Sequence, residues 1–300
     1  MTCVKFREPN FRAKVSEKSR VDARPYFRLL YAETQDAAKQ YLESLGLEVH
    51  KVEPYDFQEW KNRAQTDLEE TLRKYPQVRE AGKTYPFDAA LWGELKEHLQ
   101  DLFHGRCAYC EAWFLSVSFG DVEHFRPKAK VTDDPNHPGY YWLAYEPTNY
   151  LPSCMPCNQK AKKNRFPVKG NRIRKPGDKT ESEEPLLFNP YQDNPADHFQ
   201  YCPSRGQGGV ELTAGMVIGK SEKGKTSIDV FDLNREWLIR ERKKSQMSVR
   251  ALLKEALSNE NKDGLREILK RCLTGDEEYS SAMSAEIANY YETMGLGSPF

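Results

Sequence analysis

The 300-residue sequence lacks three features that would each define its class. It has no apolar run close to the roughly 20 residues that cross a membrane, so a membrane-spanning protein is not expected. The first residues, MTCVKFREPNFRAK, contain no apolar segment of the kind found in secretory signals, and a cytoplasmic location is therefore expected. Neither sign of charge predominates, because 45 basic residues balance 45 acidic ones. Any nucleic-acid partner must therefore be argued from the distribution of charge.

Cysteine is scarce, and four of the seven cysteines form two Cys-x-x-Cys pairs. Two residues between thiols let both sulfurs reach one ion, and two such pairs complete a tetrahedral thiolate site for zinc. The 43 residues between the pairs exceed the spacing of a compact zinc ribbon, so this segment must fold back on itself. A redox role is disfavoured, because a redox Cys-x-x-Cys normally opens a helix in a thioredoxin-like context. The sequence therefore predicts structural Zn²⁺ bound by Cys107, Cys110, Cys154 and Cys157.

Helical periodicity is strongest toward both ends of the chain, and the first hundred residues read mostly as helix. One helix is expected over 33–45, a second after the potential N-cap Asp56, and a third from about Asp88 to Gly105. Near the C-terminus another helical stripe includes Cys272, whose thiol is expected to pack in the core.

Between these helical regions the composition changes. From 107 to 167, glycine, proline, asparagine and aromatic residues predict short strands, turns and loops. Two later segments, 210–219 and 225–233, alternate in polarity like strands. These patterns predict an α+β protein, mostly helical, in three parts. The parts are an N-terminal helical region, a central core, and a C-terminal region of strands and then helices: 1–95, 96–180 and 181–300.

The segment between the cysteine pairs contains an acid next to an imidazole. The carboxylate of Glu123 suits a hard cation such as Mg²⁺, and a neutral His124 suits proton abstraction from water near pH 7. Asn158 directly follows the last cysteine, so a zinc cluster would hold its amide oxygen in place as a second ligand. Asp121 is interpreted as a supporting residue or a further ligand, and His137 as packing in a turn or, less often, approaching the metal.

Together these residues resemble a known family. The order Cys-x-x-Cys, Glu-His, Asn and Cys-x-x-Cys-Asn is similar to the HNH (ββα-metal) nucleases that carry a four-cysteine zinc site. The resemblance implies a small zinc-stabilised ββα-metal core, in which Glu123 and Asn158 bind the catalytic Mg²⁺ or Mn²⁺ and His124 is the general base. It also implies that Asn149 ties the loop that supports His124, and that nearby basic residues contact phosphate. Those residues are Arg126, Lys128, Lys160 and Lys163.

Longer stretches resemble a narrower group, the HNH subunits of bacterial anti-phage systems. They include CAYCE, VEHFRPK and CNQKAKKNRFPV, and the resemblance runs from about residue 100 to 245. Within that group, the sequence resembles the PtuB-type effectors of Septu and of certain retrons. This resemblance implies an ATPase partner of the ABC or SMC type. The N-terminal hundred residues lie outside this resemblance.

Charge is unevenly distributed, although its total is zero. Between 124 and 179, twelve basic residues stand against four acidic ones. Such a cluster supplies salt-sensitive affinity for a nucleic-acid backbone, unless it is only a solvated loop face. The leading hypothesis is a metal-dependent endonuclease, with DNA favoured and little sequence specificity. The rival hypotheses are a zinc-ribbon-like module that binds nucleic acid or protein without cutting, and a nuclease that cuts RNA such as tRNA.

Overall fold

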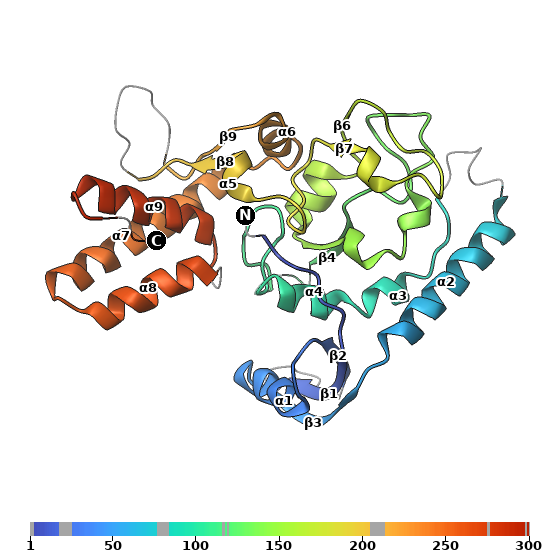
Figure 1. Ribbon diagram of the computed structural model, residues 1–300, viewed down its shortest axis with the longest axis horizontal. Coiled ribbons are helices and arrows are strands. Elements are labelled where there is room, and N and C mark those ends of the chain that lie inside the picture. Colours follow the sequence, from blue (N-terminus) through green and yellow to red (C-terminus); the bar gives the residue numbers. More distant parts are fainter. Residues whose placement is uncertain are drawn as a thin grey trace.

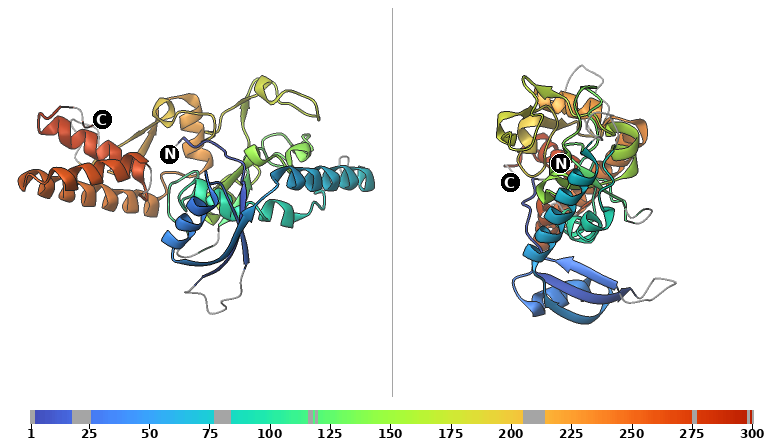
Figure 2. Two further views of the ribbon diagram at one scale, coloured as in Figure 1. Left: turned by 60° about the horizontal axis from the view of Figure 1, so that its bottom comes forward. Right: turned by 90° about the vertical axis from the view of Figure 1, so that its right-hand side faces the viewer.

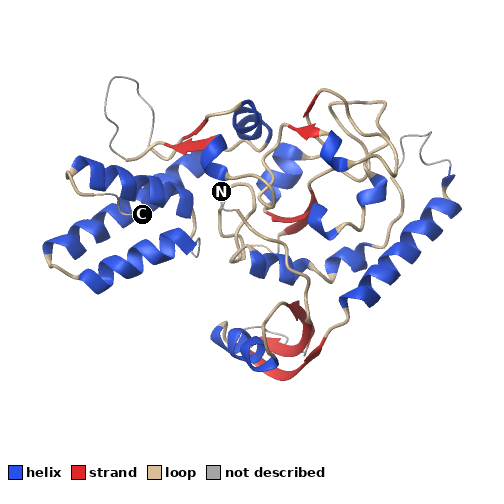
Figure 3. Ribbon diagram, in the orientation of Figure 1, coloured by secondary structure: helices blue, strands red, loops and turns tan. Residues whose placement is uncertain are grey.

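The structure is a computed structural model that describes residues 3–17, 26–76, 84–115, 118, 120–204, 214–274, 277–297 and 299. Its elements form three groups in Figure 1: a small N-terminal sheet with one helix, a central part of short strands and loops, and C-terminal helices. Figure 3 shows long helices beside much shorter strands, consistent with the expected α+β class.

The N-terminal module is a three-stranded antiparallel sheet with a helix packed against it. Its elements in chain order are β1 (Phe11–Glu17), β2 (Tyr26–Leu30), α1 (Gln35–Ser44) and β3 (Leu47–Pro54), and β1 is the central strand. Ala13 and Val15 of β1 are buried together with Leu42 of α1. The module projects away from the rest of the molecule in Figure 2. Helix α1 confirms the expected helix at 33–45, but reading the first hundred residues mostly as helix missed these strands.

Three helices connect this module to the central part. They are α2 (Phe57–Lys74), α3 (Ala89–Gly93) and α4 (Lys96–Leu102). Asp56 caps α2 as expected, because its carboxylate accepts hydrogen bonds from the amides of Gln58 and Glu59, at 2.9 and 3.2 Å. The third expected helix is instead the two short helices α3 and α4. The chain leaves α4 through Gly105, whose φ of +70° favours glycine.

The central part is built around a short β-hairpin. Its strands are β4 (Asp121–His124) and β5 (Tyr150–Ser153), followed by a π-helical stretch at Pro156–Lys162. A second small ladder pairs β6 (Val168–Lys169) with β7 (Glu184–Pro185). The remaining turns are 3₁₀ segments at Tyr141–Leu143, Pro147–Asn149 and Thr180–Ser182. Much of the core between them is aromatic, and it includes Tyr140 and Phe166.

The C-terminal part begins with a small two-stranded sheet and ends in packed helices. Its elements are α5 (Pro195–His198), β8 (Phe199–Tyr201), β9 (Val217–Gly219), α6 (Glu222–Val230), α7 (Glu236–Ser258), α8 (Lys262–Thr274) and α9 (Ser280–Thr293). Cys272 is buried between the last three helices, as expected.

One strand prediction in this region was wrong. The segment 225–233, expected as a strand, lies mostly in helix α6, because Ser221 caps the helix by accepting a hydrogen bond from the amide of Gly224 at 3.0 Å. The other segment, 210–219, forms strand β9 at its end, and its first four residues lie outside the described residues.

None of the helices within the described residues combines the length and the apolar character needed to cross a lipid bilayer.

Candidate functional site

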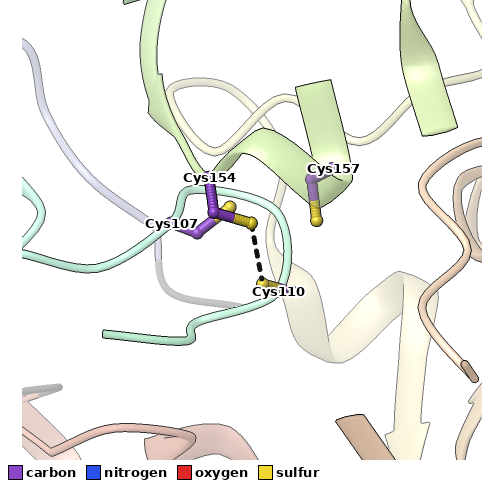
Figure 4. Close-up of side chains that lie close together, drawn as sticks. All are labelled: Cys107, Cys110, Cys154 and Cys157. Carbon is purple, nitrogen blue, oxygen red and sulfur yellow. Dashed lines mark hydrogen bonds between the residues drawn. The ribbon is translucent and has the colours of Figure 1, made fainter. Parts of the chain in front are cut away.

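The four cysteines of the two Cys-x-x-Cys pairs converge in one buried cluster. Their sulfur atoms all lie within 4.8 Å of one another, and those of Cys110 and Cys154 are 3.8 Å apart (Figure 4). A zinc ion about 2.3 Å from each sulfur requires sulfurs roughly 3.8 Å apart. The donor type, number and spacing therefore fit a closed tetrathiolate zinc site. The prediction that these four residues form one cluster is confirmed.

The cluster also has the protein contacts that a buried thiolate site needs. The Arg235 guanidinium donates to the sulfur of Cys157 at 3.4 Å, and the hydroxyl of Ser153 lies 3.7 Å from the sulfur of Cys107. Hydrogen bonds to the other three cysteines, together with burial, raise the pKa of Cys157 well above its ordinary value, so forming its thiolate is costly. A bound dication would remove this cost by stabilising the thiolates.

The hairpin of β4 and β5 runs directly into this cluster. Glu123 pairs with Leu151 and His124 with Tyr150 across the ladder, and Cys154 follows β5 without a gap. The amide of Ala108, in the first cysteine pair, donates to the carbonyl of Pro152 at 2.9 Å. Both cysteine pairs are thus attached to one edge of the hairpin.

A cavity of about 340 Å³ lies beside the hairpin and brings five of the expected site residues together. Its lining comprises Val122, Glu123, His124, Pro127, Lys128, Ala129, Asn158, Gln159, Lys163 and Asn164. The acid, the imidazole and the amide therefore share one cavity, next to the cysteine cluster. Two of the four residues expected to contact phosphate, Lys128 and Lys163, line it as well.

Glu123 is a buried carboxylate with a lysine against it. The Lys162 ammonium, which is fully buried, lies 2.5 Å from Oε1 of Glu123. Apart from this ion pair, Oε1 has no hydrogen-bond partner among the described residues. Burial raises the pKa of Glu123 above its ordinary value, against the opposing effects of Lys162 and Lys128. An oxygen with this surplus acceptor capacity fits a hard cation.

His124 is held in one tautomer by the backbone. Its Nε2 lies 3.0 Å from the carbonyl oxygen of Ala144, and because a carbonyl only accepts, Nε2 carries the proton. Nδ1 is then the nitrogen with a free lone pair. Burial, and secondarily the Lys128 ammonium, lowers the pKa of His124 to about 3. The imidazole is consequently neutral near pH 7 and can accept a proton at Nδ1.

Asn158 is oriented by a carboxylate on the hairpin. Its side-chain amide donates from Nδ2 to Oδ2 of Asp121 at 3.0 Å, and Gln159 donates to the same oxygen at 3.0 Å. Because the carboxylate accepts only, the NH₂ group faces Asp121 and the amide oxygen of Asn158 faces away from it. This oxygen and the Glu123 carboxylate are the kinds of ligand that Mg²⁺ or Mn²⁺ accepts, so the residues fit such an ion. Asp121 itself holds Asn158.

The backbone around Asn158 is unusual. The amide of Lys163 donates to the carbonyl of Asn158 at 2.7 Å, a bond that spans five residues. Lys163 also has a positive φ of 51°. Such π-helical turns are rare and are often found at functional sites.

Asn149 ties the segment after His124 to the second strand. Its Oδ1 accepts from the amide of Arg126 at 2.8 Å, and its Nδ2 donates to the carbonyl of Arg126 at 3.1 Å. The carbonyl of Asn149 also accepts from the amide of Phe125 at 2.8 Å. These three bonds lock the loop that leaves β4.

Two of the expected phosphate-contacting residues are not brought to the cavity. The Arg126 side chain is buried, where it donates to Glu183 at 2.9 Å and to the carbonyl of Thr180 at 3.4 Å. Lys160 is exposed on the π-helical stretch, outside the cavity lining. His137 lies elsewhere too: its two ring nitrogens bond to the carbonyl of Ile173 and the amide of Gly139, as in the turn-packing interpretation.

Lys162 and Arg235 are two residues of this region that the sequence does not predict. Lys162 had been counted only among the basic residues of a charged segment, and Arg235 lies 78 residues beyond the cysteine that it contacts. A signal for Lys162 existed in its position four residues after Asn158, one helical turn along the same segment. Nothing in the sequence pattern indicated Arg235.

Comparison with known proteins finds relatives of this chain. The chain is similar over about half of its length to Septu proteins. No family model matches it, and no solved structure does.

Among these relatives, a protein named Septu protein PtuB from Bacillus mycoides (strain KBAB4) is 39% identical over 166 residues, 53% of this chain and 53% of that protein. A Septu protein PtuB from Bacillus thuringiensis is 32% identical over 151 residues, 48% of this chain and 44% of the relative. A Septu protein PtuA from the same B. mycoides strain is 35% identical over 151 residues, 48% of this chain and 20% of its own length. The chain thus spans about half the length of the PtuB relatives. The predicted resemblance to PtuB-type proteins is confirmed.

Proposed function

We propose that this chain is a metal-dependent HNH endonuclease, the effector of an anti-phage defence system, that hydrolyses phosphodiester bonds with DNA as its preferred substrate. The observation that carries the proposal is the shared cavity: Glu123, His124 and Asn158 line one space beside the four-cysteine cluster. Glu123 and His124 lie on β4, which pairs with β5, and Asn158 lies on the helical stretch that follows β5. This succession of two strands and a helical stretch supports a ββα-metal core within the proposed boundaries 96–180.

The metal would be held by Glu123 and Asn158. Mg²⁺ or Mn²⁺ bound there would polarise the scissile phosphate and balance the charge that develops on the departing oxygen. Asp121 keeps the amide oxygen of Asn158 available for that ion, because it occupies the NH₂ group. Zinc in the cysteine cluster would have a structural task only, since four thiolates leave no position for water.

His124 would accept the proton of the attacking water. With Nε2 donating to the carbonyl of Ala144, Nδ1 accepts a proton from the attacking water. A base whose pKa is about 3 is weak on its own. A phosphate entering the cavity would add negative charge beside the ring, which favours the imidazolium and raises this pKa. Lys128 and Lys163 on the cavity wall would attract that phosphate.

The similar Septu proteins and the charge distribution support a partner protein and a nucleic-acid substrate. Proteins named PtuA and PtuB are both similar to this chain, which supports action within a Septu system together with an ABC- or SMC-type ATPase. The basic segment 124–179 supports backbone contacts with little sequence specificity. Such an effector would meet invading nucleic acid in the cytoplasm.

The test compares cleavage by the wild type and by His124→Ala. Each protein is incubated with plasmid DNA or tRNA in Mg²⁺ or Mn²⁺, with and without a candidate ATPase partner. His50→Ala is the matched control, because His50 is exposed on β3. His124→Ala should lose cleavage by at least about 100-fold, the usual contribution of a general base, and should retain zinc. Cleavage that survives this change would instead favour the zinc-bound binding module and would assign the cutting to a contaminant. Cleavage of tRNA but not plasmid would replace DNA by RNA as the substrate.

A further inference from the structure

Lys162 is a charged group deep inside the proposed active site. Its side chain is fully buried, and its ammonium contacts Oε1 of Glu123 at 2.5 Å and the carbonyl oxygen of His124 at 3.2 Å. It therefore touches both consecutive residues that the proposed mechanism uses. It comes from the same π-helical stretch as Asn158.

The contact neutralises the only buried carboxylate among the residues that line the cavity. A buried acid without a counter-ion is costly, so the lysine stabilises Glu123 whenever no metal is bound. It also stands beside the oxygen that the metal would use. A divalent cation at Glu123 would be repelled by the Lys162 ammonium at short range.

The other charged groups at or beside the cavity are two cations and one anion. Lys128 and Lys163 line it, and Asp121 contributes a second carboxylate, which is already engaged by Asn158 and Gln159. Three ammonium groups, those of Lys128, Lys162 and Lys163, thus lie at or beside the cavity together with two carboxylates. A site with this balance holds a dication poorly by itself. A phosphodiester would supply further anionic oxygens. Mg²⁺ is usually bound in proteins by one or two carboxylates together with substrate phosphates.

We propose that Lys162 is the built-in counter-cation of Glu123 and makes binding of the catalytic metal depend on a bound phosphodiester. In this role it is a positioning residue, which acts through Glu123. The proposal rests on the proposed nuclease function and adds to it an order of assembly: nucleic acid enters first or together with the ion. A purely structural lysine would stabilise the fold equally well but would leave metal affinity independent of nucleic acid.

The test measures Mn²⁺ binding directly, by the loss of the free-ion signal in electron paramagnetic resonance. The proteins carry His124→Ala so that a 12-base-pair DNA stays intact, and the DNA alone is the blank. The parent protein is compared with versions that also carry Lys162→Met or Lys160→Met, each with and without the DNA. Lys160→Met is the matched control, because Lys160 is an exposed lysine of the same stretch. Zinc content and melting curves report whether each variant is folded.

In the parent protein, DNA should tighten Mn²⁺ binding by at least about tenfold, equivalent to one unit in the logarithm of the dissociation constant. Lys162→Met should bind Mn²⁺ about tenfold more tightly without DNA and should gain little from it. Lys160→Met should behave like the parent. The proposal is overturned if the parent binds Mn²⁺ equally with and without DNA, or if folded Lys162→Met shows the parent's DNA dependence. Should Lys162→Met fail to fold, the comparison in the parent still decides.

These results also separate the inference from the function on which it rests. If the wild type cleaves DNA in a His124-dependent manner but Mn²⁺ binding does not depend on DNA, only the inference about Lys162 is wrong. If no protein binds Mn²⁺, either with or without DNA, both the inference and the proposed function are wrong. Cleavage of the DNA in the His124→Ala background contradicts the proposed function.

Discussion

Cys157 and Asn158 are consecutive residues that belong to two different clusters. The sulfur of Cys157 lies among the four cysteines, whereas Asn158 lines the cavity that contains Glu123 and His124. The amide of Asn158 also donates to the carbonyl of Cys154 at 3.0 Å. The cysteine cluster thereby determines where the backbone of Asn158 lies, so a structural metal would control the geometry of a neighbouring catalytic one.

Loss of one cysteine should therefore abolish both zinc binding and nucleic-acid cleavage. Cys154→Ala is expected to abolish stoichiometric zinc and to lower the free energy of unfolding by about 4 kcal/mol or more, the range of a lost structural metal. Cleavage should disappear with it. Metal analysis and thermal melting check the outcome, with Cys3→Ala as control because Cys3 is exposed. A Cys154→Ala protein with full zinc content and an unchanged melting temperature would show that the cluster holds no structural zinc.

Asp121 offers a way to disturb Asn158 without touching zinc. Asp121→Ala removes the acceptor that holds the Asn158 NH₂ group, so its amide oxygen is no longer oriented. Loss of such an outer contact typically costs about 10- to 100-fold in metal affinity or activity. The expected result is a rise in the Mg²⁺ concentration needed for half-maximal cleavage, with unchanged zinc content. Equal Mg²⁺ dependence in the variant and the wild type would show that Asn158 needs no such support.

Sequence spacing predicted the cysteine cluster, and residue chemistry together with the family resemblance pointed to Glu123, His124 and Asn158, which line the neighbouring cavity. Cys-x-x-Cys pairs act through local turns, so their geometry follows from two intervening residues. Glu123, His124 and Asn158 were found because each adjoins a recognisable feature. The strands at the N-terminus were missed although Arg12 and Lys14 alternate with the buried Ala13 and Val15, which is the pattern of a half-buried strand.

The lysines between 160 and 163 show where sequence reasoning stops. In the chain they form one basic run, and nothing distinguishes them. The fold exposes Lys160, places Lys163 on the cavity wall and buries Lys162 against Glu123. Arg126 is a similar case, because its partner Glu183 is 57 residues away and only the folded chain brings them together. Ion pairs between residues far apart in the sequence determine which charged side chains are buried. Such pairs produce no pattern in the local sequence.

His98 should make the stability of the protein depend on pH. It is buried, its Nε2 lies 2.6 Å from the carbonyl of Arg7, and burial lowers its pKa from 6.5 to about 4. In the unfolded chain it takes up a proton at higher pH, so its contribution is complete above about pH 6.5 and is lost as pH falls toward 4. The difference corresponds to about 3 kcal/mol. His98→Gln should flatten the dependence of unfolding free energy on pH between these values, as measured by urea denaturation. His50→Gln, at an exposed position, should leave the slope unchanged.

Lys160, within the π-helical stretch, and Lys163, directly after it, should differ in their effect on nucleic-acid binding. Both lysines are exposed, but only Lys163 lines the cavity, so its ammonium is expected to meet the phosphate that enters it. Each phosphate contact releases condensed counterions, so its loss reduces the slope of log affinity against log salt by about 1. Fluorescence anisotropy with a labelled DNA duplex, titrated at several salt concentrations, should show this reduction for Lys163→Ala and a smaller one for Lys160→Ala. Equal slopes for the two variants would mean that bound DNA follows the exposed basic surface and does not enter the cavity. In that case the acid, the imidazole and the amide would have no phosphate to act on.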